Sequence, residues 1–400
     1  MSRIKFLILL TVCIDILGIG IIIPVLPFYV ESFGVGAFTV TALLAVYSLF
    51  SFFSSPLLGS LSDRIGRRWV LIGSIISSAI GWLMFAAAHN VAWLFAGRII
   101  DGLAAGNITT AQSCLVDIAK DDKERSHNLG MIGAVFGIGF IIGPLLGGVL
   151  SHFGGATMPF WVVGIMSLLN ALLAVFILPE TNTHRNTTPL RLNPFAPIIR
   201  ALRDVNLRPA YLVWFLFGLA ATTAQAVFSL YVSQVFGFSA FVTGLFLTGV
   251  GLVIAVNQGV GIKHFWLKKF KEPELEVYMI IAFGIGHWLL AIGSLPIFIL
   301  GMVFTTFGQA VLRVVMTSQA LSSIDPRMKG EVLGVLNSVF LLSMVVAPVA
   351  AGWLFEHTRP GVPFVVTGVY MAVALYIVYR NRRRLARVTM QELEESSAVL

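Results

Sequence analysis

The sequence predicts an all-α membrane protein with twelve transmembrane helices in two pseudo-symmetric six-helix halves. Composition, the length of the apolar runs and an internal repeat support this prediction. The chain is 57% hydrophobic and only 12% charged, whereas soluble domains carry about 25% charged residues. Most apolar runs are about 20 residues long, enough to cross the ~30 Å hydrocarbon core of a bilayer. They lack the alternating pattern of barrel strands, so we expect helices.

Twelve spans are expected, six on each side of a polar linker. The first six cover residues 4–30, 38–61, 69–88, 91–116, 128–150 and 159–178. The other six cover residues 209–232, 240–262, 275–293, 295–321, 329–354 and 362–379. The first span begins with basic residues, as a signal peptide does. It is too long for a signal peptide and lacks a small-residue cleavage site, so we expect it to remain as a membrane helix.

An internal repeat divides the spans into two halves. Residues 130–148 align with residues 334–352 at a constant offset. Parallel six-helix repeats imply a pseudo-twofold axis along the membrane normal, with the solute site between the halves near the midplane. We therefore expect an N-terminal half, a cytoplasmic linker, a C-terminal half and a cytoplasmic tail. Their boundaries are residues 1–178, 179–208, 209–380 and 381–400.

Basic residues are distributed unevenly between the connections. Those on one side of the predicted membrane hold nearly all of them, and the opposite connections hold only Arg359. This asymmetry predicts that both termini are cytoplasmic. The net charge of +8 then reflects topology and attraction to lipid headgroups, because the basic residues are scattered rather than gathered on a face that nucleic acid would need. We expect a monomer whose partners are the lipid bilayer and a small-molecule substrate, and no nucleic acid.

The connection between the second and third spans, residues 59–68, is the most informative short segment. Its sequence is Gly-Ser-Leu-Ser-Asp-Arg-Ile-Gly-Arg-Arg, which combines an acid, three arginines and two glycines. A basic loop of this kind is expected on the cytoplasmic side. The alternative is a solvated loop that only sets topology. Its candidate functional residues are Gly59, Asp63, Arg64, Gly66 and Arg67.

Ionisable side chains inside spans are costly in lipid, so they are candidates for function. Asp15 lies near the middle of the first span, where burial favours its neutral form, and it could bind and release a proton near neutral pH. Alternatively, it only orients the helix through hydrogen bonds. Arg98 and Asp101 lie three residues apart in the fourth span and share a face. They form either a self-satisfied pair or a switch that opens when Asp101 is protonated or substrate arrives.

Two further ionisable residues lie in spans of the second half. Arg313 has no acid near it in sequence. It therefore needs a partner from another helix, a cluster of backbone carbonyls or an anionic substrate, and we expect it to face the central cavity. His287 could shuttle a proton, but a packing role is favoured.

The fifth span contains a glycine-rich segment with one proline, residues 139–148. Glycines at this spacing open a smooth groove for a neighbouring helix, and a proline removes one backbone hydrogen bond and permits a bend. Helix packing alone could explain the pattern. The residues concerned are Gly139, Gly143, Pro144, Gly147 and Gly148.

These motifs resemble those of the major facilitator superfamily over essentially the whole chain. Residues 59–68 look like its signature loop, and residues 139–148 resemble the antiporter motif of its drug/proton exchangers. Three further stretches look like the tetracycline-efflux branch of the twelve-helix drug/proton antiporters. They are the run from Asp15 to Pro27, the Arg98-x-x-x-Gly102 pattern and the phrase Leu-Asn-Pro-Phe at residues 192–195.

The resemblance implies the major facilitator fold and a reaction. The reaction is proton-coupled export of a hydrophobic or amphipathic small molecule by alternating access across the bacterial inner membrane. The proton is the coupling ion, and no cofactor is expected. In the family, residues matching Asp15 and Arg98 are linked to proton transfer, and Asp101 is a further candidate here.

The resemblance also assigns roles around the signature loop. Asp63 would cap the eleventh helix near residues 330–331. Arg67 would pair with Asp117 at the end of the fourth helix. Together these contacts would hold the two halves closed on the cytoplasmic face.

Substrate contacts are expected from aromatic and polar residues of the spans that line the cavity. Tetracycline exporters carry an acid where this chain has Phe283, which argues against a metal–tetracycline substrate. The proposed cavity residues are Tyr47, Phe50, Trp214, Gln225, Phe228, Tyr231, Gln309 and Arg313.

Two other classes of function are weighed against the exporter. A facilitator or symporter for a metabolite or lipid is disfavoured by the glycine motif of the fifth span. Nothing in the sequence suggests a sensor or scaffold without flux. An enzyme is not expected, because no nucleophile–base–acid set, metal cluster or phosphate loop is found. Cys13 and Cys114 are interpreted as buried small apolar residues rather than redox or metal-binding groups.

Overall fold

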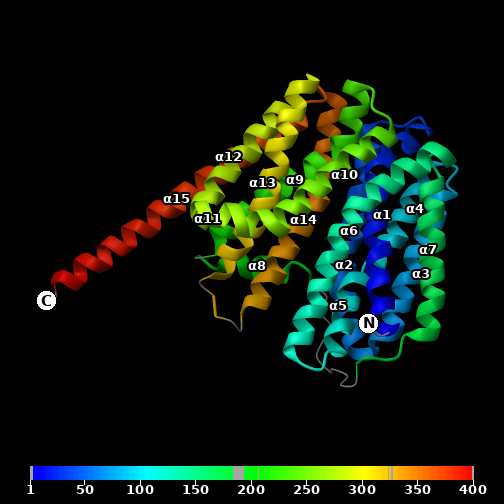
Figure 1. Ribbon diagram of the computed structural model, residues 1–400, viewed down its shortest axis with the longest axis horizontal. Helices are drawn as coiled ribbons and strands as arrows, with labels where there is room; N and C mark the ends of the chain where they lie inside the picture. Colours follow the sequence, from blue (N-terminus) through cyan, green and yellow to red (C-terminus); the bar gives the residue numbers. More distant parts are fainter. Residues whose placement is uncertain (1–2, 183–192, 206, 323, 326–327, 399–400) are drawn as a thin grey trace. The chain divides into compact units, whose positions relative to one another are not determined.

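The computed structural model describes residues 3–182, 193–205, 207–322, 324–325 and 328–398. These residues form helices and short connections, and no β-strand occurs among them. The helices that precede the linker are α1 (Arg3–Glu31), α2 (Ala37–Ile65), α3 (Arg67–Ala86), α4 (Val91–Leu103), α5 (Asn107–Asp117), α6 (Asp122–Gly154) and α7 (Met158–Ile177). Figure 1 shows their order along the chain.

A short helix and the second set of long helices follow. They are α8 (Ala196–Arg203), α9 (Arg208–Phe236), α10 (Ala240–Val256), the π-helix η1 (Asn257–Trp266), α11 (Leu267–Lys269), α12 (Glu272–Leu290), α13 (Leu295–Ser322), α14 (Lys329–His357) and α15 (Val362–Ala398). By contacts the chain divides into two compact units. Unit 1 contains residues 1–194, 225–255 and 344–360, and unit 2 contains residues 195–224, 256–343 and 361–400.

The expected all-helical membrane architecture is confirmed. Among the described residues, eleven helical segments are long and apolar enough to cross a bilayer, with α4–α5 and α10–α11 each counted as one segment. The ninth predicted span is α12, which is not among the eleven. It has 19 residues, or ~28 Å at 1.5 Å per residue, but Glu272, Glu274 and Glu276 in its first turns lower its mean hydropathy.

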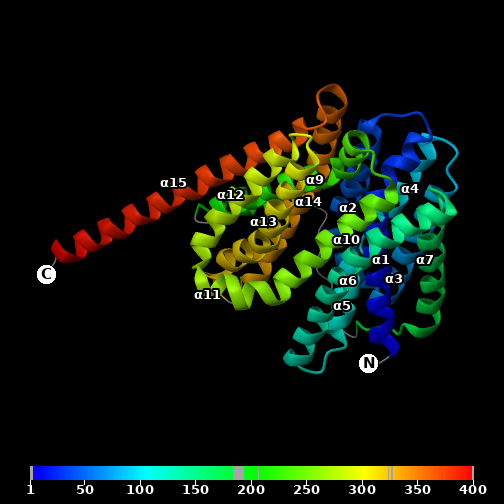
Figure 2. The ribbon, with the colours of Figure 1, turned by 45° about the horizontal axis from the view of Figure 1, so that its top comes forward.

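Glycines of α6 allow α1 to lie directly against it. A Cβ added to Gly143 would lie 2.8 Å from Cα of Gly20 on α1, and one added to Gly147 would lie 2.8 Å from the carbonyl oxygen of Ile21. Figures 1 and 2 show the two helices side by side. Another side of α6 meets α10, where a Cβ on Gly148 would approach Cα of Phe241 at 3.0 Å. The glycine motif is therefore a two-sided packing surface within unit 1.

The fourth span is broken, which corrects the expectation of one continuous helix over residues 91–116. Turns at residues 104–106 separate α4 from α5. Serine hydroxyls of α2 donate to backbone carbonyls at the break. Ser54 and Ser55 of α2 donate to the carbonyls of Gly102 (2.8 Å) and Ala105 (3.0 Å). In this way the side chains of a neighbouring helix satisfy backbone groups that lipid could not.

The signature segment is mostly helical, which corrects its interpretation as a loop. Helix α2 continues through Asp63 and Arg64 to Ile65, and α3 begins at Arg67. The connection is Gly66 alone, whose φ of 113° is a conformation that glycine adopts without a steric penalty. The span prediction ended with the apolar run at residue 61, but serine, aspartate and arginine do not stop a helix once it leaves the membrane.

The eighth and twelfth spans also differ from their predicted ends. The eighth continues from α10 into η1, a π-helix within which Trp266 Nε1 donates to Asn257 Oδ1 at 2.8 Å. The twelfth span and the first part of the predicted tail form one continuous helix, α15, which ends at Ala398 (Figure 2). Within unit 2, Arg382 of α15 pairs with Glu276 of α12 at 3.2 Å.

The contact between α1 and α6 predicts the effect of a single methyl group. Gly143→Ala should lower the free energy of unfolding by about 1–3 kcal/mol, because the new methyl group would have to force two backbones apart. The matched control is Gly133→Ala on the same helix, where the methyl group would meet no atom within 4 Å. Thermal unfolding of the purified variants, followed by tryptophan fluorescence, measures both. Equal stability of the two variants would contradict this account of the motif.

Candidate functional site

A cluster of buried and partly buried polar side chains lies in unit 1 beside the break in the fourth span. Five helices contribute to it. Its members are Asp15 from α1, Tyr47 from α2, Ser78 from α3, Arg98 and Asp101 from α4, and Asn107 from α5. The structure thus brings the three residues predicted to couple protons, Asp15, Arg98 and Asp101, into one cluster.

Arg98 is held between an acid and three aromatic rings. It is 3% exposed, and its Nη1 lies 3.5 Å from Asp101 Oδ2. Its guanidinium carbon lies 4.1, 4.6 and 5.8 Å from the ring centroids of Trp82, Phe85 and Tyr47. Cation–π attraction of this kind offsets part of the cost of burying a charge. Nε and Nη2 of Arg98 make no hydrogen bond to a described residue.

Close helix crossings position the pair formed by Arg98 and Asp101. A Cβ added to Gly97 of α4 would lie 2.8 Å from the carbonyl oxygen of Gly81 on α3. A Cβ added to Gly102 would lie equally close, 2.8 Å, to the carbonyl oxygen of Tyr47 on α2. The glycine of the Arg98-x-x-x-Gly102 pattern therefore brings Tyr47 toward Arg98.

Asp15 is joined to the rest of the cluster through Asn107. The Asn107 amide donates to Asp15 Oδ1 at 3.1 Å and to Ser78 Oγ at 3.3 Å. Ser78 in turn neighbours the carboxylate of Asp101, and the two carboxyl groups interact electrostatically. With both acids ionised, the cluster carries two negative charges and one positive charge. Uptake of one proton would make it neutral.

Asn107 and Ser78 were not among the predicted site residues. The candidates within the spans were ionisable groups, and both of these residues are neutral. Serine and threonine are common in these spans and mostly donate to backbone carbonyls three or four residues earlier, and asparagine is neutral, so residue type alone carries little signal. The break in the fourth span, which positions Asn107 at the start of α5, was also not predicted because no proline marks it.

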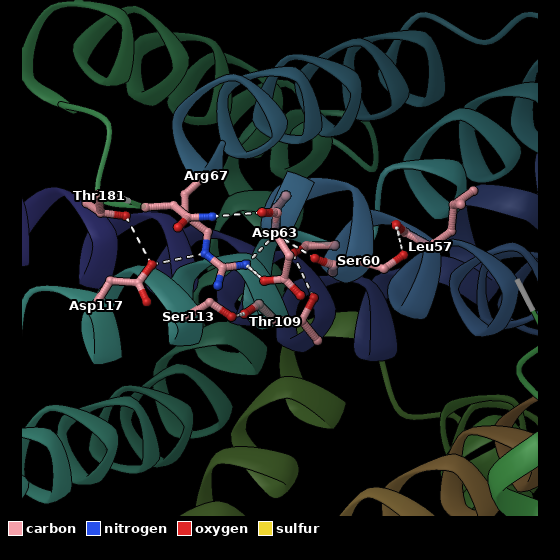
Figure 3. A network of polar contacts seen from close by, with 12 residues as sticks. Leu57, Ser60, Asp63, Arg67, Thr109, Ser113, Asp117 and Thr181 are labelled. Carbon is pink, nitrogen blue, oxygen red and sulfur yellow. Dashed lines mark hydrogen bonds and ion pairs between the residues drawn. The ribbon is translucent and has the colours of Figure 1, made fainter. Parts of the chain in front are cut away.

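A second polar network surrounds the turn between α2 and α3 (Figure 3). Arg67 is 9% exposed, and its Nε lies 3.0 Å from Asp117 Oδ2. The same guanidinium forms an ion pair with Asp63 and donates to Ser62 Oγ at 2.7 Å. Thr181 Oγ1 donates to Asp117 at 3.5 Å. The network therefore ties the ends of α2, α3 and α5 to the start of the linker.

Glu180 anchors the linker to this turn, which the sequence did not predict. Its carboxylate accepts hydrogen bonds from the backbone N–H groups of Arg67 (2.9 Å), Arg68 (3.3 Å) and Asn182 (2.9 Å). Gly66 offers α3 no capping side chain, and Glu180 supplies one from a distant part of the chain. Carboxylates are favoured at this position because the N-terminus of a helix carries a partial positive charge.

The remaining residues of the two motifs lie around these clusters. Arg64 is exposed, and a Cβ on Gly59 would meet no atom within 4 Å. Gly139 of α6 faces Ile16, the residue after Asp15, and a Cβ there would come within 2.5 Å of the Ile16 side chain. Helix α6 thus packs against α1 at the depth of Asp15.

The proposed cavity residues are divided between the units. Tyr47, Phe50, Gln225, Phe228 and Tyr231 lie in unit 1, and Trp214, Gln309 and Arg313 lie in unit 2. In unit 1, Tyr47 and Phe50 are partly buried, Gln225 is exposed, and Phe228 and Tyr231 are buried. In unit 2, Trp214 is buried and donates from Nε1 to the carbonyl of Leu336 at 2.9 Å.

The ionisable residues in spans of unit 2 differ in their surroundings. His287 is 1% exposed, donates from Nδ1 to the carbonyl of Phe283 at 2.7 Å and meets that ring edge-on. These contacts are those of a packed side chain. Arg313 is exposed, and its guanidinium makes no hydrogen bond or ion pair within the described part of the chain. It shares one face of α13 with Thr306, Gln309 and Thr317, at helical spacing.

Comparison with known proteins decides the family. The model of the Major Facilitator Superfamily matches residues 8–272 and 264–399 of the chain. The chain belongs to the major facilitator superfamily. The resemblance seen in the motifs is thereby confirmed. At the level of the family, its members are transporters rather than enzymes, and the chain is a multi-pass membrane protein.

The chain is similar in sequence to two drug-resistance proteins and in fold to a solved transporter structure. The chain is 29% identical to the class E tetracycline resistance protein of Escherichia coli, over 90% of this chain and 89% of that one. It is 26% identical to the quinolone resistance protein NorA of Staphylococcus aureus, over 98% and 100%. Its fold matches the nucleoside transporter NupG with a TM-score of 0.78 at 14% identity, over 95% and 100%. That structural likeness shows the major facilitator fold alone.

The contacts of Glu180 predict a role in stability. Glu180→Ala should lower the free energy of unfolding by about 1 kcal/mol, the typical effect of losing a helix cap. The matched control is Glu31→Ala, which removes an exposed carboxylate that makes no hydrogen bond or ion pair with a described residue. Thermal unfolding of both variants in the same detergent tests this expectation. If the two variants unfold at the same temperature, Glu180 is not a cap that matters for stability.

Proposed function

We propose that this transporter is a proton-coupled antiporter that exports hydrophobic or amphipathic small molecules by alternating access. The observation that carries the proposal is the cluster of two acids and one arginine within a single membrane-spanning helix bundle, in which Arg98 and Asp101 are buried and Asp15 is partly buried. Ionisable groups at such positions are costly, and those that membrane proteins retain there mark substrate pathways and proton relays. The names of the relatives, which are resistance proteins for tetracycline and quinolones, support export of compounds of this kind.

The charge of the cluster suggests how the exchange works. With Asp15 and Asp101 ionised and Arg98 charged, the cluster has one net negative charge, which favours uptake of one proton or approach of a substrate with cationic character. A protonated, neutral cluster attracts such a substrate less. Because Tyr47 adjoins Arg98 at 5.8 Å, a substrate that contacts the Tyr47 ring also alters the environment of that arginine. Proton and substrate would then occupy the transporter alternately.

The network at the turn between α2 and α3 supports the part of this proposal that concerns alternating access. Arg67 pairs with acids on two helices, Asp63 and Asp117, and the linker start is bonded to the same turn through Glu180 and Thr181. A rigid turn of this kind can pass movement of the linker to α2, α3 and α5 as one body. We propose that it acts on the cytoplasmic face of a bacterial inner membrane, with both termini on that side and one chain as the functional unit.

Asp15→Asn should abolish export driven by a proton gradient while leaving the protein folded. The substitution preserves shape and removes the titratable group, and a buried neutral amide costs less than a buried charge. The measurement is uphill transport of a fluorescent quinolone and a lipophilic dye in proteoliposomes with an imposed pH gradient. The control is Asp122→Asn, an acid whose side chain is 90% exposed. Uphill export by Asp15→Asn at the wild-type rate would refute the coupling role.

Arg313→Lys should change the order of preference among exported compounds, with thermal stability kept. An arginine in a membrane span seeks water or a partner, and the polar face of α13 offers a place for an anionic or hydrogen-bonding group of the substrate. Lysine keeps the charge but loses the planar, bidentate fork. Transport of a panel of neutral, cationic and zwitterionic compounds is compared for the two proteins. An unchanged order of preference together with a lowered unfolding temperature would assign Arg313 a structural role.

A further inference from the structure

We infer that Asn107 and Ser78 are positioning residues that transmit the protonation state of Asp15 to the pair formed by Asp101 and Arg98. The inference rests on the proposed function, because it takes Asp15 to be the site of proton uptake. It adds two residues that belong to none of the motifs recognised in the sequence. The contacts at the break between α4 and α5 carry it.

Two hydrogen bonds and one close contact link the two acids. Asn107 uses both N–H bonds of its amide, one toward Asp15 at 3.1 Å and one toward Ser78 at 3.3 Å. Since Ser78 Oγ accepts from Asn107, its own O–H is free to donate, and the carboxylate of Asp101 is its neighbour. Each end of this chain of contacts therefore presents a donor to a carboxylate, Asn107 to Asp15 and Ser78 to Asp101, which is the arrangement that two ionised acids require.

Protonation of Asp15 would reverse the donor and acceptor roles along this chain of hydrogen bonds. The new O–H bond of Asp15 needs an acceptor, and the Oδ1 atom of Asn107 is buried with no hydrogen-bond partner among the described residues. Rotation of the amide by half a turn brings Oδ1 to the place of Nδ2. Oδ1 then accepts from Asp15 and from Ser78. The Ser78 hydroxyl would then donate to Asn107 instead of Asp101. Asp101 would keep its ion pair with Arg98 but lose the hydroxyl as a donor.

Three members of this chain are buried deeply enough that the loss of one hydrogen bond should destabilise the site. Asn107 is 3% exposed, Ser78 4% and Asp101 5%, so water does not readily replace a missing partner. The titratable and charged groups around the chain are Asp15 from α1, Tyr47 from α2, and Arg98 and Asp101 from α4. Direct electrostatic repulsion also couples the two acids, so the test must separate that effect from the hydrogen bonds.

Infrared titration of the purified protein can separate the effect of the hydrogen bonds from that of direct repulsion, and it needs no substrate. The informative result is a cross-effect, which is a shift in the titration of the acid that a substitution does not touch. Protonated carboxyl groups absorb apart from ionised ones, and Asp15→Asn and Asp101→Asn assign the two bands. Asn107→Ala removes no group that contacts Asp101, and Ser78→Ala removes no group that contacts Asp15. We expect each variant to move the titration midpoint of the acid that it does not touch by at least ~0.4 pH unit, the lower end of the coupling seen within polar networks.

A matched control removes a similar hydrogen bond elsewhere. Asn170 of α7 is 1% exposed and donates to Thr11 of α1 at 2.9 Å, so Asn170→Ala removes a buried asparagine bonded to the same helix as Asp15. This variant should leave both midpoints unchanged. Shifts confined to the neighbouring acid in both test variants, or equal shifts in the control, would overturn the inference. Should one test variant fail to fold, the other still tests the chain from the opposite end.

Failure of the proposed function gives a different result. If Asp15→Asn removes no titrating band, Asp15 does not take up a proton and the proposal for proton coupling fails with it. If Asp15 titrates but the cross-effects are missing, the acids are coupled through space alone. In that case only the relay through Asn107 and Ser78 is rejected.

Discussion

The structure of the site depends on one constraint, which is that the charges of Asp15, Arg98 and Asp101 must find partners inside a helix bundle that lipid surrounds. Arg98 and Asp101 are 3% and 5% exposed, so little water reaches them and the protein itself must supply aromatic faces, hydroxyls and an amide. Arg98 receives three rings and one acid, and Asp15 receives the amide of Asn107. The break in the fourth span is part of this solution, because it places Asn107 beside the acids.

Glycines at helix crossings are the second requirement for this arrangement. Gly97 and Gly102 bring α4 within backbone contact of α3 and α2, and Gly143 does the same for α6 and α1. At each of these crossings a methyl group would push the helices apart. The glycine motif of α6 and the polar cluster are therefore connected through α1, since α6 packs against the turn of α1 that carries Asp15.

Much of the fold was predictable because membrane spans have a strong and simple signal. About 20 apolar residues in a row can satisfy their backbone only as a helix, so the twelve spans and the all-helical class followed from composition and length. The ends of the helices were less predictable. Residues 62–65 and 381–398 continue their helices beyond the apolar runs, since hydropathy marks where lipid ends rather than where a helix ends.

The site was predictable only in its charged members. A carboxylate or guanidinium within a span is rare and stands out, which is why Asp15, Arg98 and Asp101 could be named together. Asn107 and Ser78 carry no such signal, and Asn107 reaches Asp15 and Ser78 because of a turn in the fourth span that no proline marks. Glu180 was treated as part of a polar linker because its contact with the start of α3 joins residues more than a hundred positions apart.

The central claim is that proton and substrate exclude one another at the buried cluster. Proton release on substrate binding tests it most directly, with the purified protein in weakly buffered detergent solution and a pH indicator. Compounds that quench tryptophan fluorescence on binding would be added at a series of pH values. The account predicts release of close to one proton for each molecule bound when the cluster is protonated. Binding without proton release at every pH at which the protein is folded would contradict it.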